Sequence, residues 1–465
     1  MIGAGAAGTV AALFAASRGA ETTLVERTRD GGRKILISGG GRCNILPASL
    51  DERRFVTDSS RHTLRGLVRS WPLEQQIAFF EREVGIPLVE EPESAKLFPR
   101  SQRARDVRDG LLSLAAHRGV RFRSGLAVVD LEPHPPLGWR VLCDGTPPLE
   151  AERVVLATGG YSVPNSGSDG RGLEMLGRLG HTIHDTYPAL TPLTAPAGPL
   201  VLLAGVSLPV EVTAAGDGRR ATASGGFLFT HRGYSGPAVL DVSHVIVRAR
   251  AAGEPADLRV RWGGTAAEWD AALKPRRGRT VLAAVRSLLP ERLAAVLVER
   301  AGLDPSRLLA QLRREERTAL LESLTRCLLP LDGDEGYRKA EVTGGGVSLA
   351  EVYPSTLESR RHPGLFPLRR AAGRLRADRG LQLLLGLGNR ADRRRRRVHI
   401  GLQNPHLDRP HVATAPQIHA SRTSFRAYFA ESSAQWYCGM GLGGVTYGVA
   451  PVTVRSVPAD RSPPN

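Results

Sequence analysis

The chain has 465 residues, of which 42% are hydrophobic and 52 are glycine. This composition is typical of a soluble α/β protein and argues against a disordered chain. The formal net charge of +17 would suit a nucleic-acid-binding protein. However, residues 360–400 hold 13 arginines and only two aspartates, so the other 424 residues carry a net charge of only +6. The overall charge is therefore weak evidence for nucleic-acid binding.

The four cysteines, at positions 43, 143, 327 and 438, form no CxxC or zinc-finger spacing. Widely spaced cysteines are typical of reduced thiols in a cytoplasmic protein, and we expect no metal site. No apolar run is long enough to span a bilayer, so we also expect no membrane partner.

The first predicted unit is a dinucleotide-binding signature. Gly3, Gly5 and Gly8 have GxGxxG spacing, a helical run follows, and the next strand-like segment ends on Glu26. In such a unit the first glycine forms a tight turn, the second lets the backbone approach a pyrophosphate, and the third brings the helix against the strand. The acid accepts hydrogen bonds from ribose hydroxyls, and the helix N-terminus attracts the phosphates. The strand–helix–strand context favours this interpretation over an ordinary glycine-rich turn.

The first strand of this unit is short in the sequence. Only Met1 precedes Ile2, whereas a buried parallel strand usually has about 4–6 residues. We therefore expect a truncated first strand and a translation start that is placed several codons too late.

A glycine-rich basic loop, GGRKILISGGGRCN, follows at residues 31–44. Consecutive glycines let a backbone lie against a large flat ligand, and cationic side chains offset phosphate charge. The alternatives are a solvated basic loop and, for the cysteine, a packing role. The candidate cofactor-binding residues in this loop are Arg33, Lys34, Ser38, Gly39, Gly41, Arg42, Cys43 and Asn44.

The third element is a strand that runs into two glycines, VVLATGG, at residues 154–160. A close backbone approach at the carboxyl end of a strand is typical of ligand sites in α/β sheets. The candidate residues here are Ala157, Thr158, Gly159 and Gly160, and Val128 in an earlier strand-like segment is a candidate backbone contact to an adenine.

These motifs, together with FLFTHRGYSGPAVLDVS (227–243) and KAEVTGGGVSL (339–349), resemble the BaiN-like flavoprotein family. Members of that family are often described as NAD(P)/FAD-dependent oxidoreductases. The resemblance covers about residues 2–366. It implies an α/β fold with a Rossmann-type FAD-binding domain of the two-dinucleotide-binding kind, into which a β-rich domain and a helical domain are inserted.

The sequence supports this division into domains. Strand-like segments fill residues 196–262, and long leucine-bearing helical runs fill residues 263–330. The FAD-binding domain then takes residues 1–195 and 331–366. The leucines of the helical runs are expected to form a core.

The resemblance also implies a chemistry, which is hydride transfer through the flavin N5. An enone-type or similar small organic substrate is expected, with NAD(P)H as a transient electron donor because no second GxGxxG unit is present. The oligomeric state is not assigned, and nucleic acid is not an expected partner.

Catalytic residues cannot be named from the sequence. The candidates for acid–base catalysis are His181, His184, His231 and Tyr234, although a structural role is the stronger interpretation for each. The segment ATGGYSVPNSG departs from the family pattern at Tyr161 and Val163, which leaves the substrate side of the site unassigned.

Residues 367–465 differ in character from the rest of the chain. Family members continue after PGLF with a segment resembling LCGELLD followed by GGYNF, and this chain has no such segment. The codons for residues 367–390, read one base later, permit that segment in register. We therefore interpret residues 367–465 as an out-of-frame, poorly ordered tail.

Two alternatives remain beside the FAD-dependent oxidoreductase. One is an inactive flavoprotein relic with an incomplete FAD pocket. The other is an RNA-associated flavoprotein that uses the arginine-rich tail on phosphates.

Sequencing the gene across codons 355–400 tests the frame interpretation. We expect one extra or one missing base near codon 367, because the shifted frame restores the family segment over more than twenty codons. A gene that confirms the printed frame would contradict it.

Overall fold

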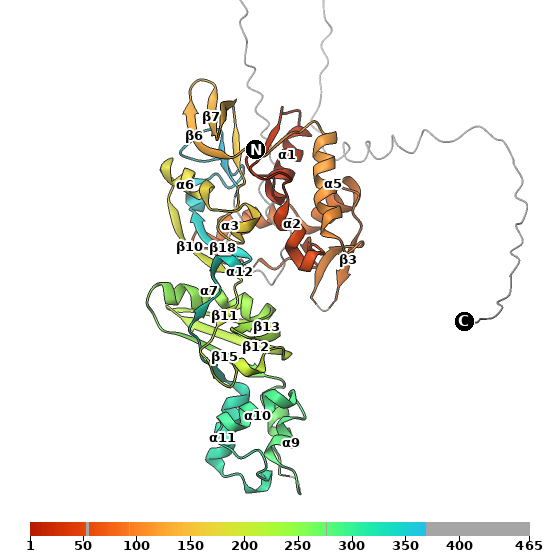
Figure 1. Ribbon diagram of the computed structural model, residues 1–465, viewed down its shortest axis with the longest axis vertical. Helices are drawn as coiled ribbons and strands as arrows, with labels where there is room; N and C mark the ends of the chain where they lie inside the picture. The colour runs from red at the N-terminus through yellow and green to blue at the C-terminus, as the bar shows by residue number, and fades with distance from the viewer. Residues whose placement is uncertain (53–54, 93, 276, 369–465) are drawn as a thin grey trace, which may run out of the picture. The chain divides into compact units, whose positions relative to one another are not determined.

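The computed structural model describes residues 1–52, 55–92, 94–275 and 277–368 (Figure 1). Apart from Pro367 and Leu368, the tail predicted to be out of frame lies outside these residues. Among the described helices, none combines the length and the apolar character needed to cross a bilayer.

A small parallel sheet organises the N-terminal part of the chain. Its strands are β1 (Thr23–Glu26), β5 (Arg121–Ser124), β9 (Val154–Leu156) and β19 (Leu365–Pro367). β5 pairs with β1, and β19 pairs with β9, both in parallel. The segment Met1–Gly3 lies between the two pairs, because Ile2 bridges both Val25 and Leu156 in parallel. The expected short first strand is therefore present as these three residues.

Backbone hydrogen bonds hold this segment on both sides. On one side, the amide of Gly3 donates to the carbonyl of Val25 at 2.8 Å. On the other, the amide of Ile2 donates to Val155 at 2.8 Å, and the amide of Ala157 donates back to Ile2 at 2.8 Å. The segment thus aligns the carboxyl ends of β1 and β9.

Helix α1 (Ala6–Ala16) starts directly after Gly5 and is rich in alanine, the residue with the highest helix propensity. It packs against α5 (Ala104–His117). Four further helical segments complete this side of the domain: α2 (Arg33–Ile37), α3 (Arg61–Arg69), α4 (Leu73–Ala78) and the π-helical turn Phe79–Glu83.

The remaining strands of this part form three small antiparallel sheets. One contains β2 (Leu46–Pro47), β3 (Leu88–Glu91) and β4 (Lys96–Pro99). The second contains β6 (Val128–His134), β7 (Gly138–Cys143) and β8 (Thr146–Ala151). The third pairs β10 (Ile183–Ala189) with β18 (Val342–Val347), and the helices α6 (Arg171–Arg178) and α12 (Gly336–Lys339) lie nearby in the sequence.

The β-rich part is a seven-stranded sheet among the described residues. Its order is β16 (Cys327–Leu329), β15 (Ala256–Trp262), β12 (Ser207–Gly216), β13 (Arg219–Thr230), β14 (Gly233–Ser235), β11 (Leu193–Thr194) and β17 (Gly333–Asp334). Helix α7 (Pro237–Ala251) packs on β12 and β13 (Figure 1). The sheet thus also contains β11, which precedes the interval 196–262 predicted from the sequence, and β16 and β17, which follow it.

The helical part contains α8 (Ala266–Ala272), α9 (Val281–Val285), α10 (Glu291–Arg300) and α11 (Arg314–Thr325). Leu293, Leu297, Leu320 and Leu324 are fully buried. They belong to the same apolar cluster as Phe227 and Trp262 of the sheet. The expected leucine core therefore exists, and it is continuous with the core of the β-rich part.

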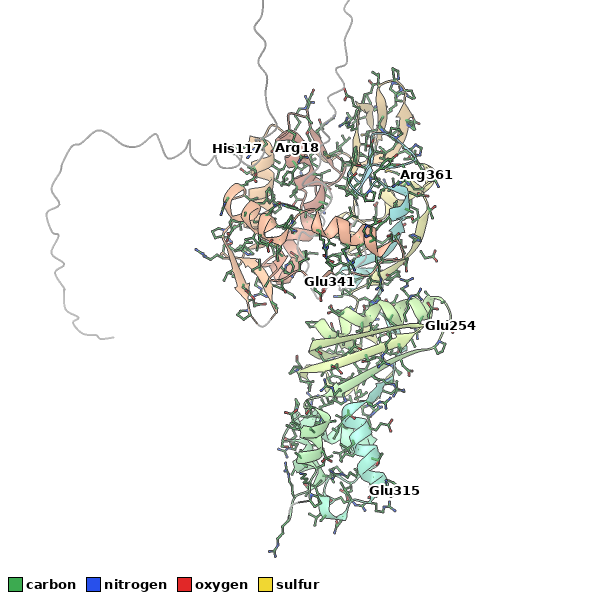
Figure 2. All side chains as sticks on the ribbon, turned by 180° about the vertical axis from the view of Figure 1, so that it is seen from behind. Arg18, His117, Glu254, Glu315, Glu341 and Arg361 are labelled. Atoms are coloured by element: carbon green, nitrogen blue, oxygen red, sulfur yellow. The ribbon has the colours of Figure 1, made fainter. Side chains whose placement is uncertain are left out.

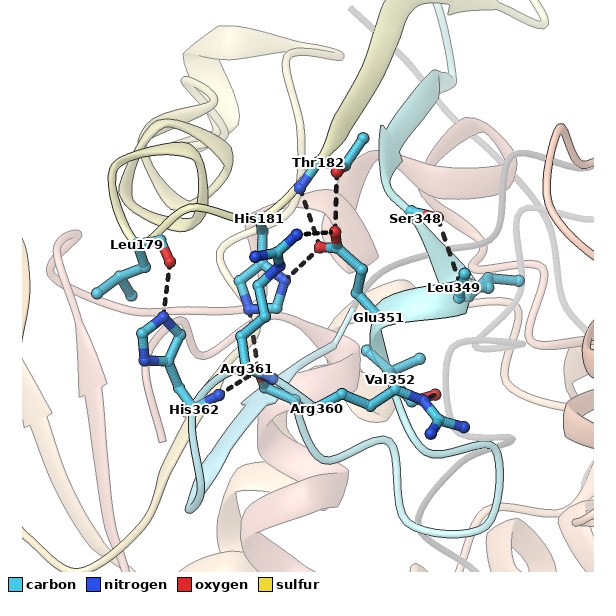
Figure 3. A network of polar contacts seen from close by, with 12 residues as sticks. Leu179, His181, Thr182, Ser348, Leu349, Glu351, Val352, Arg360, Arg361 and His362 are labelled. Carbon is cyan, nitrogen blue, oxygen red and sulfur yellow. Dashed lines mark hydrogen bonds and ion pairs between the residues drawn. The ribbon is translucent and has the colours of Figure 1, made fainter.

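A polar network around His181 ties the last described segment to the middle of the chain (Figure 3). The Ser359 hydroxyl accepts from the backbone amides of Arg361 (3.1 Å) and His362 (2.9 Å). Both acceptor positions of this oxygen are thereby filled. Its proton goes to Nε2 of His181 at 3.0 Å, and Nδ1 of His181 donates to Glu351 at 2.9 Å. This pattern requires a neutral imidazole, and burial lowers the pKa of His181 accordingly.

Glu351 is the centre of this network. Its carboxylate also accepts from the amide and the hydroxyl of Thr182 at 2.9 and 2.8 Å, and from Arg361 at 2.7 Å. The hydrogen bonds from Arg361, Thr182 and His181 lower the pKa of Glu351 to about 2. The carboxylate therefore stabilises the fold above its ordinary pKa of 4.5, and this contribution is lost as the pH falls towards 2.

The variant Glu351→Gln should lower the free energy of unfolding by about 2 kcal/mol at neutral pH, because it weakens several bonds of a largely buried network. The difference from wild type should shrink below about pH 4.5, where the wild-type carboxylate also becomes protonated. Denaturant titrations at several pH values measure both effects. Glu315→Gln on the exposed face of α11 is the control, and equal stability of the two variants would contradict this role of Glu351.

Candidate active site

A cleft lies at the carboxyl ends of β1 and β9, next to the segment Met1–Gly3. It is also lined by Leu126–Val128, by α2 and by residues 341–343 at the start of β18. Twelve of the seventeen residues expected to bind a cofactor line it: Gly3, Gly5, Glu26, Arg33, Lys34, Ser38, Cys43, Val128, Ala157, Thr158, Gly159 and Gly160. The structure therefore brings together side chains and backbone from three separate sequence motifs.

The three glycines of the N-terminal motif have different surroundings. Gly3 has a φ of +97°, and a Cβ there would lie 2.6 Å from the carbonyl oxygen of Ala157. A Cβ on Gly8 would lie 1.9 Å from the carbonyl oxygen of Gly3, whereas Gly5 has open space where its Cβ would be. Gly8 therefore serves the packing of α1 on the turn and does not line the cleft, and Gly5 leaves room for a ligand.

Glu26 is buried at the end of β1 and held by the chain itself. Its Oε2 accepts from the amide of Ala4 at 2.8 Å, and its Oε1 accepts from the amide and the hydroxyl of Thr28 at 2.9 and 2.8 Å. A carboxylate can accept about four hydrogen bonds, so one position remains for a hydroxyl of a ligand.

The glycine-rich loop contributes less to the cleft than the sequence suggested. Arg42 does not line it, because its guanidinium pairs with Glu91 at 2.8 Å and lies over the ring of Phe98 at 4.3 Å. Its Nε also donates to the carbonyl of Gly39 at 3.2 Å. The guanidinium of Arg42, expected to contact a phosphate, thus contacts strands β3 and β4 and the carbonyl of Gly39.

Three other residues of this loop also lie outside the cleft lining. Asn44 is buried, and a Cβ on Gly39 would lie 2.9 Å from its backbone nitrogen. Gly41 has a φ of +88°, so it serves the turn. The glycines therefore fold the loop tightly on itself. Gly40, which also has a positive φ, completes the turn.

Cys43 lines the cleft, and burial raises the pKa of its thiol to about 11. The thiol is therefore protonated at neutral pH. Cys43, Cys143 and Cys327 are buried and free, and Cys438 lies outside the described residues. The cytoplasmic location expected from the cysteines stays a prediction.

The loop after β9 is fixed by a residue far away in the sequence. The hydroxyl of Thr343 in β18 accepts from the backbone amides of Tyr161 (2.8 Å) and Ser162 (3.0 Å). A Cβ on Gly160 would lie 2.6 Å from this hydroxyl oxygen, and a Cβ on Gly159 would lie 2.6 Å from the hydroxyl oxygen of Ser168. Both glycines therefore allow close contacts with hydroxyl side chains that line the cleft.

Several lining residues were not expected from the sequence. Glu341, labelled in Figure 2, Val342 and Thr343 line the cleft from the EVTGGGV motif. Arg27, Thr28, Ser162 and the segment 166–169 line it as well. The EVTGGGV motif was a usable signal, because it carried the family resemblance, but its contact with the cleft depends on long-range pairing.

The candidates for acid–base catalysis do not line the cleft. His181 belongs to the network of Glu351, and His231 lies in the exposed turn between β13 and β14. His184 lies in β10 opposite Gly346. Tyr234 is fully buried among Phe227 and Phe229, and this burial raises the pKa of its hydroxyl.

A structural role for these four residues agrees with this placement. Within the described residues, no group of three or more His, Cys, Asp or Glu side chains is arranged to hold a metal ion.

Comparison with known proteins gives a family for most of the chain. Residues 1–368 match the family model described as HI0933-like protein Rossmann domain. The 3-dehydro-bile acid delta(4,6)-reductase of Clostridium scindens is 29% identical, over 79% of this chain and 90% of the relative. The ribosomal RNA dihydrouridine synthase of Escherichia coli is 30% identical, over 79% of this chain and 89% of the relative.

A solved structure also resembles the chain. It is the 3-ketosteroid-delta4-(5alpha)-dehydrogenase from Rhodococcus jostii RHA1 in complex with 4-androstene-3,17-dione, with 15% identity and a TM-score of 0.42. The match covers 83% of this chain and 94% of that structure. The family match confirms the resemblance seen in the motifs, the Rossmann-type α/β fold and the assignment to the FAD-dependent oxidoreductases.

The contrast between Gly8 and Gly5 gives a direct test of the turn. Gly8→Ala should lower the free energy of unfolding by about 2 kcal/mol, because its Cβ would overlap the carbonyl oxygen of Gly3. Gly5→Ala should leave stability nearly unchanged and weaken FAD binding, because its Cβ points into open space beside the cleft. Denaturant unfolding and FAD titration of both variants measure this. Equal loss of stability in the two variants would show that the packing account is wrong.

Proposed function

We propose that this chain, which belongs to the HI0933-like protein Rossmann domain family, is a reductase that uses FAD to saturate a carbon–carbon double bond conjugated to a carbonyl group. The observation that carries this proposal is the cleft, where a GxGxxG turn, an acid at the end of β1 and the ATGG loop meet. The open space at Gly5 fits a bulky group beside the N-terminus of α1.

In this proposal the cleft holds FAD lengthwise. Glu26 accepts from the ribose hydroxyls, and Val128 contacts the adenine with its backbone. The pyrophosphate lies at the N-terminus of α1, next to Gly3 and Gly5. Ser38, Cys43, Gly159 and Gly160 also line the cleft, and the proposal places the isoalloxazine ring beside them. Arg33 and Lys34, which line the cleft as well, contribute positive charge.

When bound and reduced by two electrons, FAD would supply a hydride from the flavin N5. The product also needs one proton, which must come from a side chain of the cleft or from water. The Cys43 thiol is protonated at neutral pH, and Glu341 also lines the cleft. NAD(P)H is proposed as the electron donor that binds transiently.

The substrate class follows from the chemistry that the names of two relatives share. One is a delta(4,6)-reductase of a 3-dehydro-bile acid, and the other is a synthase of dihydrouridine in ribosomal RNA. Both names describe the saturation of a double bond next to a carbonyl group, in a steroid ring in one case and in a uracil ring in the other. A small organic enone is our first candidate for this chain.

Uridine in ribosomal RNA is the second candidate, and the name of the 30% identical relative favours it. The charge of residues 1–368 gives RNA little support, because 47 basic and 41 acidic side chains leave a net charge of +6. RNA-binding domains usually carry a stronger basic excess. The arginine-rich segment after residue 390 lies outside the described residues.

The two candidates can be separated with the reduced enzyme. Under anaerobic conditions, the FAD-loaded protein is reduced with NADPH, NADH or dithionite and mixed with a 3-keto-4,6-diene steroid or with unmodified ribosomal RNA. We expect the steroid to reoxidise the flavin and to gain two hydrogen atoms by mass spectrometry. Formation of dihydrouridine with no steroid turnover would favour the second candidate. Failure of both acceptors, while the flavin still accepts electrons, would contradict the proposed substrate class.

A further inference from the structure

The contact between Thr343 and Ser162 has a feature that the proposed function does not use. The two hydroxyl oxygens are 2.9 Å apart, and both residues line the cleft. Ser162 is 1% exposed and Thr343 is 7% exposed, so neither hydroxyl is freely hydrated. The contact joins the loop after β9 to Thr343, the second residue of strand β18.

The direction of this hydrogen bond follows from counting acceptor positions. A hydroxyl oxygen has two lone pairs and one proton. The lone pairs of Thr343 accept from the backbone amides of Tyr161 and Ser162. The Thr343 oxygen therefore has no lone pair left for the proton of Ser162, so Ser162 does not donate its proton to Thr343.

The proton of Ser162 is then left for another acceptor. Within the described residues, Thr343 is the only hydrogen-bond partner of the Ser162 hydroxyl. A buried hydroxyl proton without an acceptor costs free energy, so such protons usually have a partner. The cleft that Ser162 lines is the place from which a ligand can supply one.

The position of Ser162 along the cleft indicates which part of a ligand it meets. The segment after Ser162 continues to Asp169, which forms an ion pair with Arg27. Gly167 of this segment packs against Thr28, beside the proposed ribose-binding acid Glu26. Ser162 itself contacts the Thr343 hydroxyl, which lies 2.6 Å from where a Cβ on Gly160 would be, and Gly160 belongs to the residues proposed to face the isoalloxazine ring.

We propose that Ser162 donates its hydroxyl proton to an acceptor atom of the isoalloxazine ring of FAD, and that Thr343 is the positioning residue that orients it. This inference rests on the proposed function, because it requires FAD in the cleft. A donor on the ring stabilises added electron density more than it stabilises the oxidised ring, so it raises the reduction potential of the flavin. Lys34, whose Nζ lies close to Gly159, adds positive charge to the same region.

Ser162→Ala, Thr343→Val and Thr343→Ser test this arrangement in the full chain. We measure the Kd for FAD by fluorescence titration and the midpoint potential of the bound flavin. Ser162→Ala should weaken FAD binding about fivefold, the loss expected for one neutral hydrogen bond, and should lower the potential. Thr343→Val should lose at least as much affinity, because it also removes the acceptor of two backbone amides. Thr343→Ser keeps the hydroxyl and should behave like wild type.

Ser113→Ala, on the exposed face of α5, is the control, because it removes a serine hydroxyl away from the cleft and should leave the Kd for FAD and the potential unchanged. If Ser162→Ala has the Kd and the potential of wild type, the inference is wrong while the proposed function stands. If Thr343→Ser binds FAD as weakly as Thr343→Val, Thr343 does not position Ser162 through its hydroxyl. If wild type itself does not bind FAD, the proposed function fails and this inference fails with it. Should Thr343→Val not fold, Ser162→Ala and Thr343→Ser still decide the question.

Discussion

The contact between Gly8 and the carbonyl of Gly3 is the constraint on which the rest of the site depends. It leaves no room for a side chain, so α1 lies directly on the turn that follows the segment Met1–Gly3. That segment bridges β1 and β9 and sets the register of their carboxyl ends. The cleft exists because Glu26 at the end of β1 and Ala157 after β9 are brought to the same edge of the sheet.

The distant parts of the chain complete this edge through a few polar contacts. Thr343 holds the loop after β9 through two backbone amides, and the network of Glu351 and Ser359 fixes the segment that leads into β19. β19 then pairs with β9 in parallel. Loss of the Thr343 hydrogen bonds or of the Glu351 network would destabilise the walls of the cleft and leave the GxGxxG turn unchanged. The stability of the fold and the shape of the site are therefore coupled through residues whose contacts depend on long-range pairing.

The sequence predicted those features that local spacing determines. The glycine turn, Glu26 and the ATGG loop line the cleft, as the spacing of the motifs predicted. The family match confirms the fold class. Arg42 was expected at the cleft and is not there, because Glu91 and Phe98 come from strands whose pairing cannot be derived from the loop itself. Thr343 was missed for the same reason, since its partners are about 180 residues away. The family match ends at residue 368, and the interpretation of residues 367–465 stays a prediction.

The central claim is that the cleft between β1, β9 and β18 binds FAD, and the visible absorption of the purified full chain tests it most directly. We predict flavin absorption bands, and one FAD released per chain on denaturation, either as purified or after incubation with FAD. A colourless protein that takes up no FAD while its far-ultraviolet circular dichroism shows a folded α/β chain would contradict the account.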